Sequence, residues 1–366
     1  MPEIESLTVS VYTVPTEEPE SDGTLAWSAT TVVVVEPSAG GMTGLGFSYA
    51  TGACATLIGD VLEKVVIGQD AMDVGRCWSA MVRAIRNFGR PGVVSMAIAA
   101  VDIALWDLKA KLLGLPLVKA LGQVYEGVDA YGSGGFTSLS DSQLTGQLGN
   151  WVHEQGFTRV KMKVGEDWGR RPGRDLERAR LARVTIGENV ELFVDANGGY
   201  STKQAVRMAR AYDQLGVTWF EEPVSSDHLD DLAEIRAQTP IDVAAGEYGY
   251  DLFYFGTMCE AGAIDCLQAD ISRCAGLTEW LRVAALAERH GLEISGHCAQ
   301  SLHLHPACAV GNVRHLEYFV DHARLDRMLF DGVVDPVGGV LRPDLSRPGL
   351  GLELKRPDAE VYRVMT

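Results

Sequence analysis

Positive charge is scarce in this sequence. Its 366 residues include 32 Lys and Arg against 49 Asp and Glu, which gives a formal net charge of −17. Binding to nucleic acid or to an anionic membrane surface needs a basic face, so neither is expected as a partner. Long hydrophobic runs are also missing, because the longest β-branched run, Thr30 to Val35, is far too short to span a bilayer.

Paired cysteines and targeting signals are missing as well. The seven cysteines are scattered from Cys54 to Cys308 without any Cys-x-x-Cys pair, which indicates reduced thiols rather than a disulfide framework or a zinc ribbon. The opening residues, Met-Pro-Glu-Ile-Glu, lack the basic segment of a secretory signal. We therefore expect a cytoplasmic protein. No serine elbow, phosphate-binding loop or Gly-x-Gly-x-x-Gly motif follows a strand in the required context.

What is present is the composition of an ordinary globular protein, with 46% hydrophobic and 22% charged residues. The length suggests two domains, or one large barrel with an attachment. Up to about residue 120, alternating or apolar runs give way to segments with apolar residues every three or four positions. These patterns predict an α+β domain, 1–120, with strands at 4–14, 29–36 and 42–49 and helices at 55–66, 71–87 and 95–113.

Between the first two predicted strands, the segment Pro15 to Ala26 is polar and acidic and contains the turn sequence Asp22-Gly23. Loops of this length are usually functional or disordered. We predict a lid over residues 15–27 that is mobile without ligand and closes on binding. Trp27, at its end, is interpreted as a core anchor in preference to an aromatic side chain that contacts substrate.

From residue 121 the pattern becomes strand, loop and helix in repetition. Eight such units fit an α/β fold of the (β/α)₈ TIM-like barrel type, at 121–324, better than an open sheet. The tail, 325–366, is rich in Pro, Gly and Arg and is expected to pack back over the barrel or the first domain. The predicted strands are 127–133, 158–163, 191–195, 217–221, 241–246, 264–269, 292–296 and 315–318, and the clearest helices are 201–215, 229–237 and 277–290.

Three acids end successive predicted strands at equal intervals. Asp195, Glu221 and Glu247 stand 26 residues apart, about the length of one strand-plus-helix unit. The C-terminal ends of barrel strands meet at one mouth, so the three carboxylates would converge there. Mg²⁺ prefers such hard oxygen ligands and keeps places for water or substrate. The alternative is that each acid only caps the helix that follows it.

Two lysines end the second barrel strand. Lys161 and Lys163 alternate with Met162, so both would face the mouth. Neighbouring cations there would lower the pKa of a lysine toward that of a useful base. The alternative is a solvated pair at the edge of a sheet.

Ionisable residues also end the last three strands. Adjacent strands could bring Asp270 against His297, which would fix the tautomer of the imidazole and raise its basicity. Glu317 lies in the eighth strand, where a protonated carboxyl could donate a hydrogen bond to a substrate oxyanion. His303 and His305 are two residues apart, which on a helix points them in different directions, so we do not treat them as metal ligands.

As an ordered set, these motifs resemble the enolase superfamily, and most closely its mandelate racemase-like branch, over essentially the whole chain. The motifs are Lys-x-Lys at 161–163, Val-Asp-Ala-Asn-Gly at 194–198, Glu-Glu-Pro at 221–223, Gly-Glu at 246–247, Asp270, Gly-His at 296–297 and Leu-Glu at 316–317.

The resemblance implies a capping domain in front of the barrel, and it assigns a role to each residue. Asp195, Glu221 and Glu247 would bind Mg²⁺, which Mn²⁺ can replace, with Glu222 outside the ligand set. Lys163, assisted by Lys161, would be the base on one face of the substrate. His297, paired with Asp270, would serve the opposite face, and Glu317 would steady the enediolate.

The resemblance further implies abstraction of the proton α to the carboxylate of a small molecule, by an enzyme expected to be a homo-oligomer. Dehydration of an acid sugar to a 2-keto-3-deoxy acid is the leading prediction. Racemisation or epimerisation of a 2-hydroxy or amino acid is the second, and a lactone-forming or lactone-opening reaction the third. A metabolite-binding barrel without catalysis is the alternative from a different class.

Overall fold

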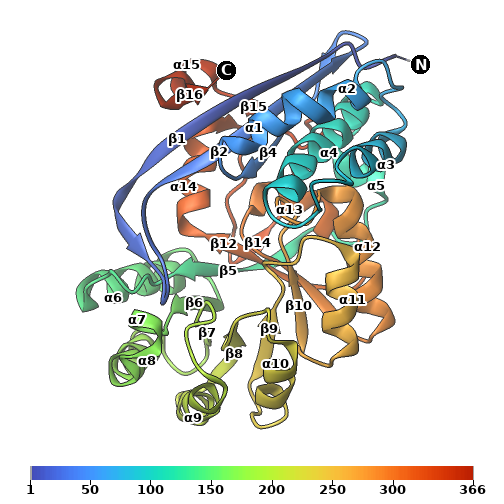
Figure 1. Ribbon diagram of the computed structural model, residues 1–366. Helices are drawn as coiled ribbons and strands as arrows, with labels where there is room; N and C mark the ends of the chain where they lie inside the picture. The colour runs from blue at the N-terminus through green and yellow to red at the C-terminus, as the bar shows by residue number, and fades with distance from the viewer. Residues whose placement is uncertain (1, 366) are drawn as a thin grey trace.

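The computed structural model describes residues 2–365, in which an N-terminal domain, here called the cap, lies against the mouth of a barrel (Figure 1). The cap is built on an antiparallel sheet in the order β16-β1-β2-β3, with β4 also paired to β2. Its first strands are β1 (Ser6–Ser21), β2 (Ala26–Ala39), β3 (Met42–Thr43) and β4 (Gly46–Tyr49). Its helices are α1 (Ala53–Leu57), the π-helix η1 (Ile58–Leu62), α2 (Glu63–Val66), α3 (Val74–Ala84), α4 (Val93–Leu112) and α5 (Leu117–Leu121).

Helix α4 is the centre of the cap. Small residues such as Ala97, Ala100 and Ala104 are fully buried, because the sheet approaches the helix backbone closely. A Cβ added to Gly44 or Gly46 would lie 2.3 Å from backbone atoms of Ala104. Glycine is therefore required at both positions, and the strand predicted over 42–49 is divided into β3 and β4 at this contact.

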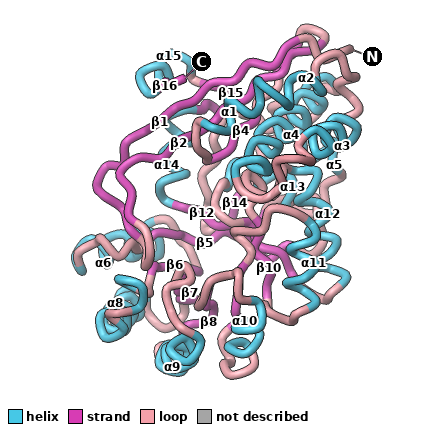
Figure 2. The backbone as a smooth tube through the Cα atoms, viewed as in Figure 1, coloured by secondary structure: helices cyan, strands magenta, loops and turns pink. Residues whose placement is uncertain are grey.

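The polar segment after Pro15 is not the loop predicted from the sequence. β1 and β2 pair from Ser6 with Ser38 as far as Ser21 with Ala26, with a register shift between Pro15 and Glu20. Only the residues between Ser21 and Ala26 form the turn. This arm of the hairpin extends beyond the cap core and over the barrel mouth (Figure 2). It therefore has no apolar face to bury, and its residues are polar.

The remaining chain closes into the predicted barrel of eight parallel strands, because β12 pairs with β5. All eight strands begin and end within two residues of their predicted bounds. They are β5 (Val128–Gly134), β6 (Arg159–Lys163), β7 (Glu191–Asp195), β8 (Val217–Glu221), β9 (Asp242–Ala245), β10 (Cys266–Ala269), β11 (Glu293–Gly296) and β12 (Val313–Phe319).

Helices surround this barrel in the usual TIM-like arrangement. They are α6 (Asp141–Gly149), the π-helix η2 (Asn150–Glu154), α7 (Glu166–Gly169), α8 (Pro172–Ile186), α9 (Thr202–Asp213), α10 (Leu229–Arg236), α11 (Leu252–Glu260), α12 (Leu277–Arg289), α13 (Gln300–Ala307) and α14 (Val320–Leu329). Within the described part of the chain, no helix is long and apolar enough to cross a membrane.

The last segment of the chain contacts both parts of the molecule. β13 (Phe330–Asp331) pairs with β15 (Glu353–Leu354), and β14 (Val340–Leu341) pairs with β5 of the barrel. After α15 (Arg356–Ala359) and the 3₁₀ turn η3 (Glu360–Tyr362), β16 (Arg363–Met365) pairs with β1 of the cap. The domain bounds at residues 120 and 324 stay a prediction, and α14 runs across the second of them.

Candidate active site

The C-terminal ends of β6, β7 and β8 place three of the predicted site residues side by side. Lys163 pairs with Asp195, and Asp195 with Glu221, in the parallel registers of these strands. Glu247 follows β9 after Gly246 and completes the row. All four side chains are buried, so their charges act on one another with little screening by water.

Both lysines turn into this acidic cluster. Lys161 is fully buried and contacts Glu221, with Glu317 Oε1 at 2.8 Å and Asp195 Oδ2 at 3.8 Å. Lys163 contacts Asp195. The predicted lowering of a lysine pKa by a neighbouring cation is present here as the effect of Lys161 on Lys163. Burial also lowers the pKa of Lys163, but the carboxylates of Asp195, Glu247 and Glu317 together outweigh these effects and raise the pKa above its usual range.

The three acids predicted to bind a metal fit a hard divalent cation. Together they offer only oxygen ligands, and Glu247 Oε2 is buried without a hydrogen-bond partner. One oxygen each from Glu221 and Glu247 and a ring nitrogen of His297 lie within 4.8 Å of one another. A buried carboxylate oxygen without a partner is costly, and a cation held between Asp195, Glu221 and Glu247 would satisfy it.

His297, just after β11, is held by an acid from the neighbouring strand. Its Nδ1 lies 2.9 Å from Asp270 Oδ2, and Ser272 donates to Asp270 Oδ1 from both its backbone N and its Oγ at 2.7 Å. An Asp270 oxygen fixed in this way sets the orientation of the imidazole. Burial lowers the pKa of His297, but Glu247, Glu317 and Asp270 outweigh it and raise the pKa, which favours the imidazolium.

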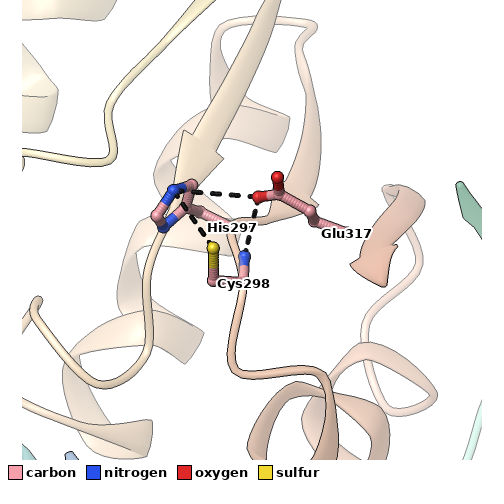
Figure 3. A group of neighbouring side chains, drawn as sticks. All are labelled: His297, Cys298 and Glu317. Atoms are coloured by element: carbon pink, nitrogen blue, oxygen red, sulfur yellow. Dashed lines mark hydrogen bonds and ion pairs between the residues drawn. The ribbon is translucent and has the colours of Figure 1, made fainter. Parts of the chain in front are cut away.

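Glu317, in β12, lies on the other side of this imidazole (Figure 3). Ser133 Oγ and Cys298 N donate hydrogen bonds to its two oxygens at 2.5 and 2.9 Å, and His297 Nε2 lies 3.7 Å from Oε2. Burial raises the pKa of Glu317, but Lys161 and His297 outweigh it and hold the pKa well below its usual range. The carboxyl is therefore ionised here, whereas the sequence predicted a protonated donor.

His303 and His305 are structural. His303 Nε2 accepts a hydrogen bond from Ile271 N at 3.1 Å, and His305 Nδ1 accepts one from Val118 N at 3.1 Å. Burial lowers the pKa of both imidazoles to about 4. Both rings are therefore neutral near pH 7, and each uses a ring nitrogen to accept a hydrogen bond from the backbone.

A cavity of about 410 Å³ lies between the barrel mouth and the cap, within the usual range for a small-molecule site. Lys163, Glu247 and His297 line it from the barrel. Trp27 lines it from the cap and also packs against the small buried cluster of Phe136, Cys298 and Phe319, so its place agrees with the predicted anchor as well as with the alternative of a side chain that faces substrate. Its ring lies edge-on to Phe136, with centroids 5.6 Å apart.

Arg273 also lines this cavity and was missed in the sequence. Its Nη1 lies 3.3 Å from Glu247 Oε1, and its Nε lies 3.4 Å from Asp270 Oδ2. The guanidinium thus joins a predicted metal-binding acid to the acid that orients His297. Its position three residues after Asp270, in the loop that follows β10, is the feature of the sequence that could have indicated it.

Comparison with known proteins shows that the chain belongs to the mandelate racemase/muconate lactonizing enzyme family of the enolase superfamily. The N-terminal domain model of that family matches residues 6–122, and the enolase C-terminal domain-like model matches residues 143–359. The chain is 31% identical over 316 residues to D-galactarolactone cycloisomerase of Agrobacterium fabrum, with 82% of each chain covered.

Two solved structures show the same fold over the whole chain. A mandelate racemase/muconate lactonizing enzyme-like protein from Rubrobacter xylanophilus is 50% identical, with a TM-score of 0.96, and the match covers 99% of this chain and 100% of that one. L-talarate/galactarate dehydratase from Salmonella typhimurium LT2, liganded with Mg and L-lyxarohydroxamate, is 28% identical, with a TM-score of 0.91 and coverage of 100% and 93%. Relatives at about 30% identity are acid-sugar dehydratases or cycloisomerases.

Proposed function

We propose that this enzyme dehydrates an acid sugar to a 2-keto-3-deoxy acid, with Mg²⁺ held by Asp195, Glu221 and Glu247. The observation that carries the proposal is that Lys163 and His297 line one cavity from β6 and from the end of β11, which lie far apart around the barrel. A substrate held at the acids would lie between these two groups. One can remove a proton from C2 while the other serves the leaving group.

The proton α to a carboxylate is weakly acidic, because its removal places a second negative charge beside the first. When bound by the three acids, Mg²⁺ would oppose that charge and weaken the hold of Asp195 on the Lys163 proton. Once Lys163 has released its own proton to solvent, its neutral amine can take the proton from C2. Lys161 lies beside Glu317 and Glu221 as a fixed positive charge, already oriented before the reaction begins.

Elimination requires that the hydroxyl at C3 leave as water. His297 is suited to donate the proton. Glu247, Glu317 and Asp270 raise its pKa, and the last two lie outside the three metal-binding acids, so they would still favour its protonated form with a cation bound. Asp270 keeps its imidazole directed toward the cavity, and Glu317 fixes the backbone N–H of Cys298 beside it. The resulting enol gives the 2-keto-3-deoxy acid by tautomerisation.

Two acid–base groups reaching one cavity from different strands are also what an epimerase needs. Epimerisation at C2 is therefore the second candidate. It would follow if His297 returned a proton to C2 instead of protonating the hydroxyl at C3.

The test is a screen of hydroxy acids with Mg²⁺ in D₂O, in which 2-keto acid formation and deuterium incorporation at C2 are both measured. We expect keto acid from at least one acid sugar, and no turnover after chelation until Mg²⁺ or Mn²⁺ is restored. Deuterium exchange without elimination for every acid offered would favour the epimerase. Full activity in thoroughly chelated enzyme would contradict the proposal.

A further inference from the structure

The cavity above the metal-binding acids has two unlike ends. At the barrel mouth it is lined by Lys163 and Arg273, the only Lys or Arg among its lining residues in the described chain. The other end, here called the cap wall, consists of lining residues from the cap and from the start of α14. They are Asp22, Leu25, Trp27, Ala29, Thr30, Thr31, Tyr49, Ala50, Thr51, Phe319, Asp321 and His322.

The charged groups of the cap wall are acids. Asp321 accepts a hydrogen bond from Thr30 Oγ1 at 2.6 Å, and it pairs with Arg324 at 2.7 Å. Arg324 is committed to this pair and to the carbonyl of Pro15 at 3.0 Å, and it does not line the cavity. Asp22, the other acid, lies in the turn of the hairpin.

The remaining polar groups of the cap wall are neutral. His322 Nδ1 accepts a hydrogen bond from Ala299 N at 3.2 Å, so its proton lies on Nε2, which can donate to a hydroxyl. Burial lowers the pKa of His322 to about 4, which leaves the ring uncharged. Thr31 and Thr51 add hydroxyl groups, and Thr51 is exposed.

At the barrel mouth, the cations are already matched by acids. Arg273 lies between Glu247 and Asp270, and Lys163 contacts Asp195. One substrate carboxylate can be held there once a divalent cation is bound to the acids. A second carboxylate would have to lie against the cap wall or in the adjoining cavity beside Asn197 and Tyr248. Among the described residues, no Lys or Arg lines either place, and acids line both.

We propose that the substrate is a polyhydroxy monocarboxylate, whose carboxylate lies at the metal-binding acids and whose uncharged, hydroxylated end lies against the cap wall. The inference rests on the proposed function for the placement of the carboxylate. Diacids of the same carbon skeleton are disfavoured, because Arg324 is already committed to Asp321 and no Lys or Arg among the described residues of the cap wall is left to pair with a second carboxylate.

The test uses pairs of six-carbon acids with the same configuration from C2 to C5, which differ only in carrying CH₂OH or a carboxylate at C6. With Mg²⁺-loaded enzyme, we expect kcat/KM for the best monoacid to exceed that of its matched diacid by about 100-fold or more. A diacid that equals or exceeds its matched monoacid would overturn the inference.

Thr51→Lys places a cation on the cap wall at an exposed position. It should raise the ratio of diacid to monoacid kcat/KM by about tenfold or more. Thr56→Lys is the matched control, because Thr56 is an exposed threonine in α1 that does not line the cavity, and it should leave the ratio unchanged. A ratio that moves equally in both variants would show that overall charge, not the cap wall, sets the preference.

Binding separates this inference from the proposed dehydration. In Lys163→Ala loaded with Mg²⁺, calorimetry should give a Kd for the monoacid at least tenfold lower than for its matched diacid. If no acid yields 2-keto acid with wild-type enzyme, the proposed function fails, and this Kd ratio still decides the substrate class. Equal Kd values, or tighter binding of the diacid, would contradict the inference even if dehydration is observed.

Discussion

Glu221 and Glu222 are adjacent in the chain but have different surroundings. Glu221 contacts Lys161 and accepts a hydrogen bond from Trp219 Nε1 at 2.9 Å. Glu222 adopts a φ of 37°, uncommon for a residue with a Cβ, and lines a second cavity of about 540 Å³ beside the first. Strain of this kind is typical of functional sites.

Loss of one ligand charge should weaken a divalent cation site far more than loss of a charge next to it. We expect Glu221→Gln to reduce Mg²⁺ affinity at least tenfold more than Glu222→Gln, as measured by calorimetry on the chelated protein. The reverse order would show that the ligand of the Glu-Glu-Pro motif is Glu222.

Lys163 and His297 should act on opposite faces of one carbon atom. Lys163→Ala and His297→Asn are each expected to lower turnover about 10³-fold or more, with the fold and Mg²⁺ affinity kept. With a substrate analogue that cannot eliminate, NMR in D₂O should show that His297→Asn exchanges one C2 epimer and Lys163→Ala the other.

The matched controls for these variants are Lys203→Ala and His228→Asn, which change the same residue types at exposed positions outside the cavity. Both controls should exchange and turn over like the wild type. If the two site variants exchange the same epimer equally, the assignment of the bases to opposite faces is wrong.

At this scale, the sequence predicted positions better than protonation states. Lys163, Asp195 and Glu221 could be placed because strand ends at equal spacing converge in a barrel. The direction of the pKa shift of Lys163 depends on whether the charge nearest to it is Asp195 or Lys161. The two arrangements differ by a few ångströms, and the alternation of side chains along a strand cannot distinguish them. The same holds for Glu317, since its ionised state follows from contact with Lys161.

Among the secondary-structure elements, the β1–β2 hairpin links the cap to the candidate site. Its turn lies on the loop that follows Lys163, where a Cβ added to Gly23 would lie 2.6 Å from Val164 O and 2.7 Å from Gly165 O. Trp168 N also donates to Gly23 O at 2.9 Å. A side chain at position 23 must therefore lift the hairpin away from the barrel or displace this loop.

We expect Gly23→Ala to lower kcat/KM about tenfold to 100-fold, because small displacements of positioned groups are costly in catalysis. The unfolding temperature should stay near that of the wild type. Hydrogen exchange should be faster in the hairpin, and ligand should protect residues 20–27 less. Gly75→Ala is the control, since a Cβ there meets nothing within 4 Å. Wild-type kinetics for Gly23→Ala would mean that this contact does not position the site.

Elements with an apolar face were predictable, and the hairpin was not. The barrel strands are buried between the barrel interior and the helices, and apolar runs such as those of β7 and β8 reveal most of them. After Pro15 the backbone pairing resumes only at Glu20 with Trp27 and Ser21 with Ala26. This arm is polar, so hydrophobic periodicity, the main signal of a strand, is absent. The lid function of residues 15–27 stays a prediction, now for a hairpin rather than a loop.

Across the whole molecule, the cap and barrel meet through buried polar contacts. Asp102 in α4 is fully buried and accepts hydrogen bonds from Thr278 N and Oγ1 at 2.8 and 2.6 Å, at the start of α12. Burial raises the pKa of Asp102 to about 7, although the hydrogen bonds from Thr278 oppose the shift. The folded protein thus holds a proton that the unfolded chain releases near pH 4.

The sign of the pH dependence follows from this difference. The protonated carboxyl is favoured in the folded state, so its contribution to the free energy of unfolding is present below about pH 4 and is lost as the pH rises to about 7. We expect urea unfolding, followed by circular dichroism from pH 5 to pH 8, to show this loss in the wild type. In Asp102→Asn, the loss of unfolding free energy between pH 5 and pH 8 should be smaller by about 1–3 kcal/mol.

Asp60→Asn, at an exposed position in η1, leaves the buried carboxyl in place and should keep the wild-type slope. A slope for Asp102→Asn that equals that of the wild type would show that Asp102 is ionised in the folded protein across this range.

The pairing of β16 with β1 also has a consequence for the order of events during synthesis. β1 is translated first, but β16, which pairs with one of its edges, is translated more than 340 residues later. At about 5–20 residues per second, that interval is roughly 20–70 s. The hairpin that lines the candidate site therefore belongs to a sheet that is completed only after all eight barrel strands have been translated.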